Sequence, residues 1–125
     1  MQQGDTISAI ATPQGEGGIG VIRISGEHAL KTAGRVFRAA NGKPLVMAGS
    51  HHAVYGHIVD EKGQIIDECL ALIMLAPHSY TVEDVVELQC HGGLMTLRKT
   101  LELTWQAGAR PAERGEFTKR AFLNG

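Results

Sequence analysis

Runs of apolar residues, separated by Gly, Pro and Asp, recur along most of the chain and predict strands. Their length, their branched side chains and the turn residues between them are typical of short strands. The polar segment 60–63, DEKG, lies between two of these runs and predicts a hairpin turn. The predicted strands cover residues 6–11, 19–25, 51–59, 65–76 and 85–90.

Two other segments place their apolar residues at helical spacing. A helix is expected over residues 27–38, capped by Ser25, and a second over 94–106, ended by Gly108. The expected core positions are Ala29, Leu30, Ala33, Val36 and Phe37 in the first helix, and Leu94, Leu97, Leu101 and Trp105 in the second.

Strands and helices are interspersed around a hairpin, so the expected fold class is α+β. The sheet is expected to be mixed, largely antiparallel and made of about five strands, with two to three helices. Residues 41–50 read as a connecting loop, and residues 118–125 as the start of a third helix.

The composition fits one globular domain. The chain has 125 residues, of which 43% are hydrophobic and 20% charged, which argues against disorder. Its net charge of −1 removes the excess of Lys and Arg that a free-standing nucleic-acid binder carries. Direct reading of nucleic acid is therefore not expected, although the tail has a local basic cluster. That cluster consists of Arg110, Arg114, Lys119 and Arg120.

A cytoplasmic location is expected, with no membrane contact. The first five residues lack the basic-then-apolar order of a signal peptide. The longest apolar run, residues 69–76, is far shorter than the ~20 residues of a membrane-spanning helix. Two cysteines, Cys69 and Cys90, are too few for a disulfide scaffold.

Several common site types find little support. The glycine-rich residues 15–20 run into a strand, whereas a dinucleotide-binding loop must open a helix. No P-loop is present, so this chain alone is not expected to bind GTP or ATP. Six histidines make a metal site a minor alternative, since no pair has zinc-site spacing.

Arg23 is the first candidate for chemistry. Strand alternation puts it on one face with Val21 and Ser25, opposite Ile22 and Ile24. An arginine at such a position either faces water or needs an acidic partner or an anionic ligand. The pattern alone leaves both interpretations open.

The segment 85–93 carries a second candidate surface. Its odd positions Glu87, Gln89 and His91 share one strand face and span ~13 Å, comparable with a fused heterocycle and its substituents. A carboxylate such as Glu87 can accept two parallel N–H bonds, which suits the amidine-like edge of a guanidine or a pterin. The Gly92-Gly93 turn then opens a helix. A half-exposed strand with its polar side in water explains the same pattern equally well.

Three sequence blocks, taken together, resemble the tRNA-modification GTPases of the MnmE/TrmE family. They lie in the family's order and span nearly the whole chain. The first includes DTI at residues 5–7, Ala11-Thr12-Pro13 and GGIGVIRISG at 17–26; the second SYT at 79–81, EDVVEL at 83–88 and HGG at 91–93; the third RGEFTKRAFLN at 114–124.

The resemblance implies an N-terminal folate-binding and dimerisation domain, similar in fold to the aminomethyltransferase type, covering residues 1–117. Residues 118–125 would begin a helix that leads to further helical and GTPase domains. Implied ligands are 5-formyl- or 5,10-methylene-tetrahydrofolate, with GTP, Mg and K only in the full-length protein. Implied partners are a second copy, a flavoprotein and tRNA, whose wobble uridine (position 34) is modified at C5.

By the same resemblance, Arg23 and Glu87 match the family's folate contacts, and His91 and Gly92 would shape the pocket. The sequence also departs from the family, with Gln14 and Glu16 where a Pro and an Arg are common. A family lysine that contacts folate would follow Gly125. The alternative is a dimerisation or protein-docking module without a ligand site of its own.

Overall fold

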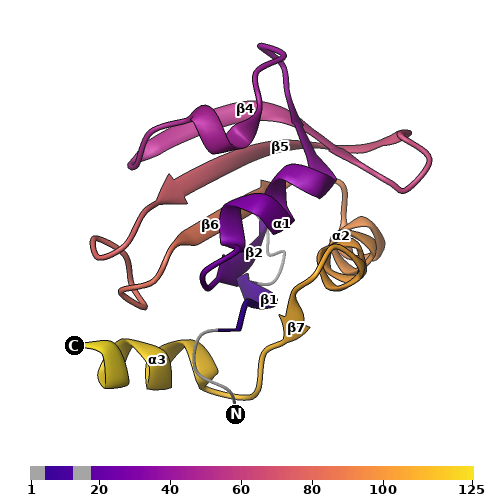
Figure 1. Cartoon of the computed structure of the whole chain (residues 1–125). Helices are drawn as coiled ribbons and strands as arrows, with labels where there is room; N and C mark the ends of the chain where they lie inside the picture. The colour runs from indigo at the N-terminus through magenta and orange to yellow at the C-terminus, as the bar shows by residue number, and fades with distance from the viewer. Residues whose placement is uncertain (1–4, 13–17) are drawn as a thin grey trace.

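The computed structural model describes residues 5–12 and 18–125, and the predictions for positions 13–17 of the glycine-rich loop fall outside them. One sheet of seven strands runs through the described chain in the order β3-β4-β5-β6-β2-β1-β7 (Figure 1). All neighbours are antiparallel except β1 and β7. The strands are β1 Ile7–Thr12, β2 Gly20–Ser25, β3 Phe37–Ala39, β4 His52–Val59, β5 Ile65–Met74, β6 Val85–Cys90 and β7 Arg110–Pro111.

Three α-helices accompany the sheet: α1 Ala29–Val36, α2 Leu94–Gln106 and α3 Glu116–Asn124. A single turn of 3₁₀ helix, η1 Leu45–Met47, lies in the expected loop. α1 and α2 contact each other and pack on the sheet, while α3 extends away at the end of the chain (Figure 1). The predicted α+β class with a mixed, largely antiparallel sheet is confirmed. The strands beyond the expected five are the short β3 and β7.

The core lies between the sheet and the two packed helices. Ile22 and Ile24 of β2 are fully buried, as are Val86 and Leu88 of β6. The alternate positions point to the opposite face, where Val21, Arg23, Glu87 and Gln89 are half-buried and Ser25 and Val85 are buried. This confirms the alternation predicted for both strands.

The first helix is shorter than predicted, and its expected cap is wrong. α1 has His28 at its N-cap position, with no side-chain capping bond. The Ser25 hydroxyl instead hydrogen-bonds Thr81 and Glu83, at 2.6 and 2.9 Å between oxygens. At the other end Phe37 turns into β3 and pairs with Ile58, so its ring reaches the core from a strand.

The second helix has the predicted bounds, but the prediction of its buried face is only partly correct. Leu97 is buried, whereas Leu94, at the first position of the helix, is 52% exposed. The buried polar positions are Thr100 and Thr104, whose hydroxyls bond helix carbonyls at 2.8 and 2.6 Å. A hydroxyl satisfied in this way can lie in the core, and a search for apolar residues alone overlooks it. Within the described residues no helix is long and apolar enough to cross a membrane.

Candidate functional site

Arg23 and Glu87 face each other at the centre of the sheet. They are directly opposite in the antiparallel pairing of β2 with β6. Arg23 Nε donates to Glu87 Oε2 at 2.9 Å. The two side chains remain 25% and 16% exposed, on the sheet face opposite α1 and α2. The structure therefore joins two candidates that lie 64 residues apart in sequence.

Two aromatic rings flank the Arg23 guanidinium. Its central carbon lies 5.2 Å from the centre of the Tyr80 ring and 5.4 Å from that of Phe117. At these distances the negative faces of the rings attract the cation. The Tyr80 hydroxyl also hydrogen-bonds the Thr118 hydroxyl at 2.8 Å, which ties the loop before β6 to α3. The pair thus lies beside two flat, apolar surfaces.

An open cavity of about 330 Å³ lies next to this pair. Arg23, Tyr80 and Phe117 are among its lining residues, together with β1 and the turn before α3; Glu87 is not. Among the described residues, neither terminal nitrogen of Arg23 nor Oε1 of Glu87 has a hydrogen-bond partner. The site therefore keeps unused donors and an unused carboxylate oxygen beside a hollow.

His91 and Gly92 lie farther along the same strand, where β6 ends. Both backbone N–H groups donate to Asp67 Oδ2 on β5, at 3.1 and 3.0 Å. The His91 ring nitrogen Nδ1 lies 3.3 Å from the carbonyl oxygen of Glu68. His91 lies four positions after Glu87, a distance of ~13 Å along an extended strand. These two candidates therefore form a separate cluster around Asp67.

Gly92 is required by the packing of this turn. A Cβ on it would lie 2.8 Å from Thr96 Cγ2 and 3.1 Å from the Asp67 carboxyl carbon. A side chain there would displace the carboxylate that holds the turn. Gly92 therefore has a structural reason to be glycine, whatever ligand the turn faces.

A buried ion-pair network anchors α3 beside the Arg23 site. Arg120 is fully buried and forms ion pairs with Asp5, Glu83 and Glu116, at 2.5, 3.1 and 3.2 Å. Arg110 adds ion pairs to Asp5 and Glu116, both at 2.6 Å. The network joins the start of the chain, the loop before β6, β7 and α3. It also shows that only two cations of the predicted basic tail, Arg114 and Lys119, lie free on the surface.

The network lowers the pKa of two carboxyl groups. The hydrogen bond from Arg110 is the main cause for Asp5, with Arg120 adding to it. Burial raises the pKa of Glu116, but the bonds from Arg110 and from the Glu113 backbone, with both arginine charges, outweigh it, so the pKa is lowered. Both groups are therefore more strongly ionised in the folded chain than in an unfolded one.

The cysteines and histidines offer no catalytic arrangement in the described chain. Cys69 and Cys90 are buried neighbours across β5 and β6 and form no disulfide. The hydrogen bond between them and burial raise the pKa of Cys69, which disfavours a reactive thiolate. No three His, Cys, Asp or Glu side chains within residues 5–12 and 18–125 are grouped to hold a metal ion.

Sequence reasoning missed the residues that surround the pair. Tyr80 and Phe117 belong to recognised sequence blocks, but nothing in their spacing placed them on Arg23. Asp67 gave no signal, because its partners lie more than 20 residues away. The one local signal of the network is the spacing of Glu116 and Arg120, which lie one helical turn apart.

Comparison with known proteins places the chain in a family. The family described as "GTP-binding protein TrmE N-terminus" matches residues 6–125. The tRNA modification GTPase MnmE of Symbiobacterium thermophilum is 61% identical over 97% of this chain and 26% of its own length. The proteins of the same name from Geobacillus thermodenitrificans and Alkaliphilus metalliredigens are 52% and 54% identical over 100% and 97% of this chain, and 27% and 26% of their own. The chain spans about a quarter of the length of these relatives. It therefore belongs to the MnmE/TrmE family of tRNA modification GTPases and corresponds to their N-terminal domain.

Proposed function

We propose that this domain binds a tetrahydrofolate derivative and self-associates within a tRNA-modifying GTPase. In this proposal residues 1–117 form the folate and dimerisation domain, and residues 118–125 lead into the rest of the protein. GTP, Mg and K are bound by the rest of the protein. With a flavoprotein partner in the cytoplasm, the assembly modifies C5 of the wobble uridine, using the one-carbon unit of 5-formyl- or 5,10-methylene-tetrahydrofolate.

The single observation that carries the folate proposal is the Arg23–Glu87 pair with its unused polar atoms. Glu87 Oε1 has no partner in the described chain and can accept an N–H from the amino-pyrimidine edge of a pterin. The free terminal nitrogens of Arg23 can donate to a carbonyl or carboxylate oxygen. Tyr80 and Phe117 add flat surfaces of the kind that a conjugated ring packs against.

His91 and Gly92 take a supporting role in this proposal. They lie ~13 Å along the strand from Glu87, so they do not hold the same edge of a pterin. A folate is an elongated molecule, with a pterin at one end and a glutamate at the other. The turn held by Asp67 is a candidate wall for its far end.

Calorimetric titration with 5-formyltetrahydrofolate tests the proposal. Glu87→Gln keeps the shape of the side chain but removes the charge, and we expect the binding free energy to fall by about 2–3 kcal/mol, or roughly 30- to 150-fold in Kd. Glu102→Gln, on the exposed side of α2, is the matched control and should leave Kd unchanged. Unchanged binding by the Glu87 variant would remove Glu87 from the site.

Sedimentation at several concentrations tests self-association separately. A dimer should raise the average mass above the 13.4 kDa of one chain as the concentration increases. Dimer formation without folate binding would favour the docking-module alternative. A strict monomer that binds folate would instead support a pocket within one chain.

A further inference from the structure

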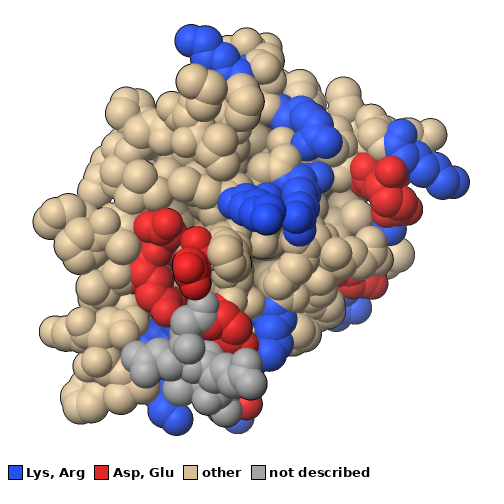
Figure 2. Space-filling model, in the orientation of Figure 1, with Lys and Arg blue, Asp and Glu red and all other residues tan. Residues whose placement is uncertain are grey.

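Positive charge is concentrated on one part of a chain whose net charge is −1. Residues 28–59 contain four Lys and Arg residues and no Asp or Glu. The remaining eight cations share the chain with all 13 acidic residues. Figure 2 shows Lys and Arg side chains gathered at the middle of one face, over α1, with Asp and Glu side chains to either side. The charge is therefore segregated.

The four cations of this region line a single hollow. It has a volume of about 440 Å³ and lies between α1, β3 and the loop before η1. We call these residues the basic rim: Lys31, Arg35, Arg38 and Lys43. All four are exposed, and none is ion-paired with a carboxylate of the described chain.

Two members of the basic rim are held in place by backbone carbonyls. Arg35 donates to the carbonyl oxygen of Ala107, at the end of α2, at 2.6 Å. Arg38 folds back on α1 and donates to the carbonyl of Gly34 at 2.9 Å. Each guanidinium keeps further N–H groups for a ligand. Between the cations, Leu30, Phe37 and Leu45 give the hollow an apolar floor.

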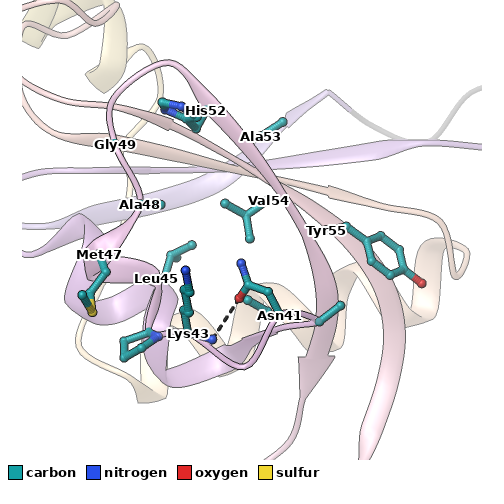
Figure 3. Close-up of a pocket in the computed structure, with 13 residues that line it drawn as sticks. Asn41, Lys43, Leu45, Met47, Ala48, Gly49, His52, Ala53, Val54 and Tyr55 are labelled. Atoms are coloured by element: carbon teal, nitrogen blue, oxygen red, sulfur yellow. Dashed lines mark hydrogen bonds between the residues drawn. The ribbon is translucent and has the colours of Figure 1, made fainter.

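A second hollow of about 430 Å³ continues the surface on the other side of the loop. The two hollows share Lys43 and its neighbours Pro44 and Leu45. Figure 3 shows Asn41 and Lys43 pointing into the second hollow, with Val54 and Leu45 on its wall. His52 adds another polar group at its edge. Cations and hydrogen-bond donors thus follow one track over two hollows.

We propose that the basic rim binds the phosphodiester backbone of an RNA, with sugars or bases entering the adjacent hollows. The proposal rests on the proposed function, in which the domain works on tRNA. Lys and Arg side chains that neutralise phosphates release the counterions condensed on the nucleic acid, which favours binding. Apolar floors between the cations suit the sugars and bases that separate successive phosphates. The net charge of −1 is an average over the whole chain, so it did not indicate this local basic surface.

Salt-dependent binding of a fluorescent, unmodified tRNA transcript tests the proposal. Four phosphate contacts predict a slope of log Kd on log salt of about 3, or a roughly 50-fold loss between about 50 and 200 mM salt. Lys31→Ala combined with Lys43→Ala should lower the slope by about 1.4. Neither lysine side chain makes a hydrogen bond or ion pair within the described residues, so an unchanged melting temperature should accompany the loss.

The matched control removes the same charge elsewhere. Lys62→Ala with Lys119→Ala alters two exposed lysines, at the hairpin and on α3, and should leave the slope unchanged. An equal loss in both double variants, or no binding at about 50 mM salt, would overturn the proposal. So would equally strong competition by polyglutamate, which would indicate an acidic protein partner.

Folate titration on the same samples separates the two proposals. If the unaltered chain binds folate but not tRNA, the basic-rim proposal alone is contradicted. If the Glu87 variant loses folate binding but still binds tRNA, the result supports the proposed folate site and shows that tRNA binds elsewhere.

Discussion

Arg23 on β2 and Arg120 on α3 are both paired with carboxylates, yet their surroundings differ. Arg120 is fully buried and shares three carboxylates, two of which also bind Arg110. Arg23 is a quarter exposed, has one carboxylate, and lies between two aromatic rings. One cluster uses most of its polar atoms within the protein, whereas the other leaves several unused.

This difference separates stability from binding. A buried charge that loses its partner cannot recover the interaction from water, so the Arg120 cluster should dominate the stability of α3. A half-exposed pair is weaker for the fold, because water replaces much of what is lost. The same incomplete satisfaction leaves Arg23 and Glu87 able to bind something else. The two clusters are also connected, since Phe117 of the Arg23 site lies one turn before Arg120.

The largest effect is expected from Arg120→Ala. It leaves Glu116 buried without its closest helical partner and Glu83 without its arginine, so we expect a loss of about 3–5 kcal/mol in unfolding free energy. Chemical denaturation measures the loss, and trypsin cleavage after Lys119 reports release of α3. Arg114→Ala, an exposed neighbour, is the control and should change stability by less than about 0.5 kcal/mol. Equal effects from the two variants would contradict a structural role for the network.

Acid should weaken the same network, with a smaller loss of unfolding free energy than Arg120→Ala causes. The pKa values of Asp5 and Glu116 are lowered in the folded chain. Their stabilisation is therefore complete above the unfolded pKa values near 4 and is lost as the pH falls through the folded values. Denaturation between about pH 7 and pH 3 should show this decline. Glu116→Gln should flatten it, and a pH curve parallel to that of the unaltered chain would count against this account.

The Arg23–Glu87 pair should contribute little to the fold. Glu87→Gln removes one charge from a partly solvated pair, and the rings of Tyr80 and Phe117 still hold Arg23. We expect a change of less than about 1 kcal/mol in unfolding free energy. A loss as large as that of Arg120→Ala would mean that the pair is structural, and would weaken the folate proposal.

The strands of the site could be predicted, but their partners could not. β6 has the predicted bounds because Val86, Leu88 and Cys90 alternate with polar residues, and this pattern needs no tertiary information. Alternation also gave the face of Arg23. It could not give the register that sets Arg23 opposite Glu87, which depends on pairing between distant segments. The family resemblance implied that both residues contact a folate, but it did not predict that they pair with each other.

Long-range polar contacts explain most of what sequence reasoning missed. Ser25 looks like a helix cap, but Thr81 and Glu83 bind its hydroxyl from 56 and 58 residues away. Arg120 looks like part of an exposed basic tail, but it is buried and pairs with Asp5, which lies 115 residues away in sequence. Short strands such as β3 have too few residues to show a period. These features arise from tertiary packing, which a local pattern cannot display.

The smallest effect is expected from the most exposed ion pair. Lys99 Nζ lies 3.8 Å from Glu61 Oε2, and the two side chains are 44% and 56% exposed. Water solvates both charges and salt screens them, so Lys99→Ala should change the unfolding free energy by less than about 0.5 kcal/mol. Denaturation at low and high salt provides the measurement, and Arg98→Ala, also exposed on α2, is the control. A loss comparable with that of Arg120→Ala would show that exposure does not rank these ion pairs, because the least buried pair would then stabilise the fold as strongly as the fully buried one.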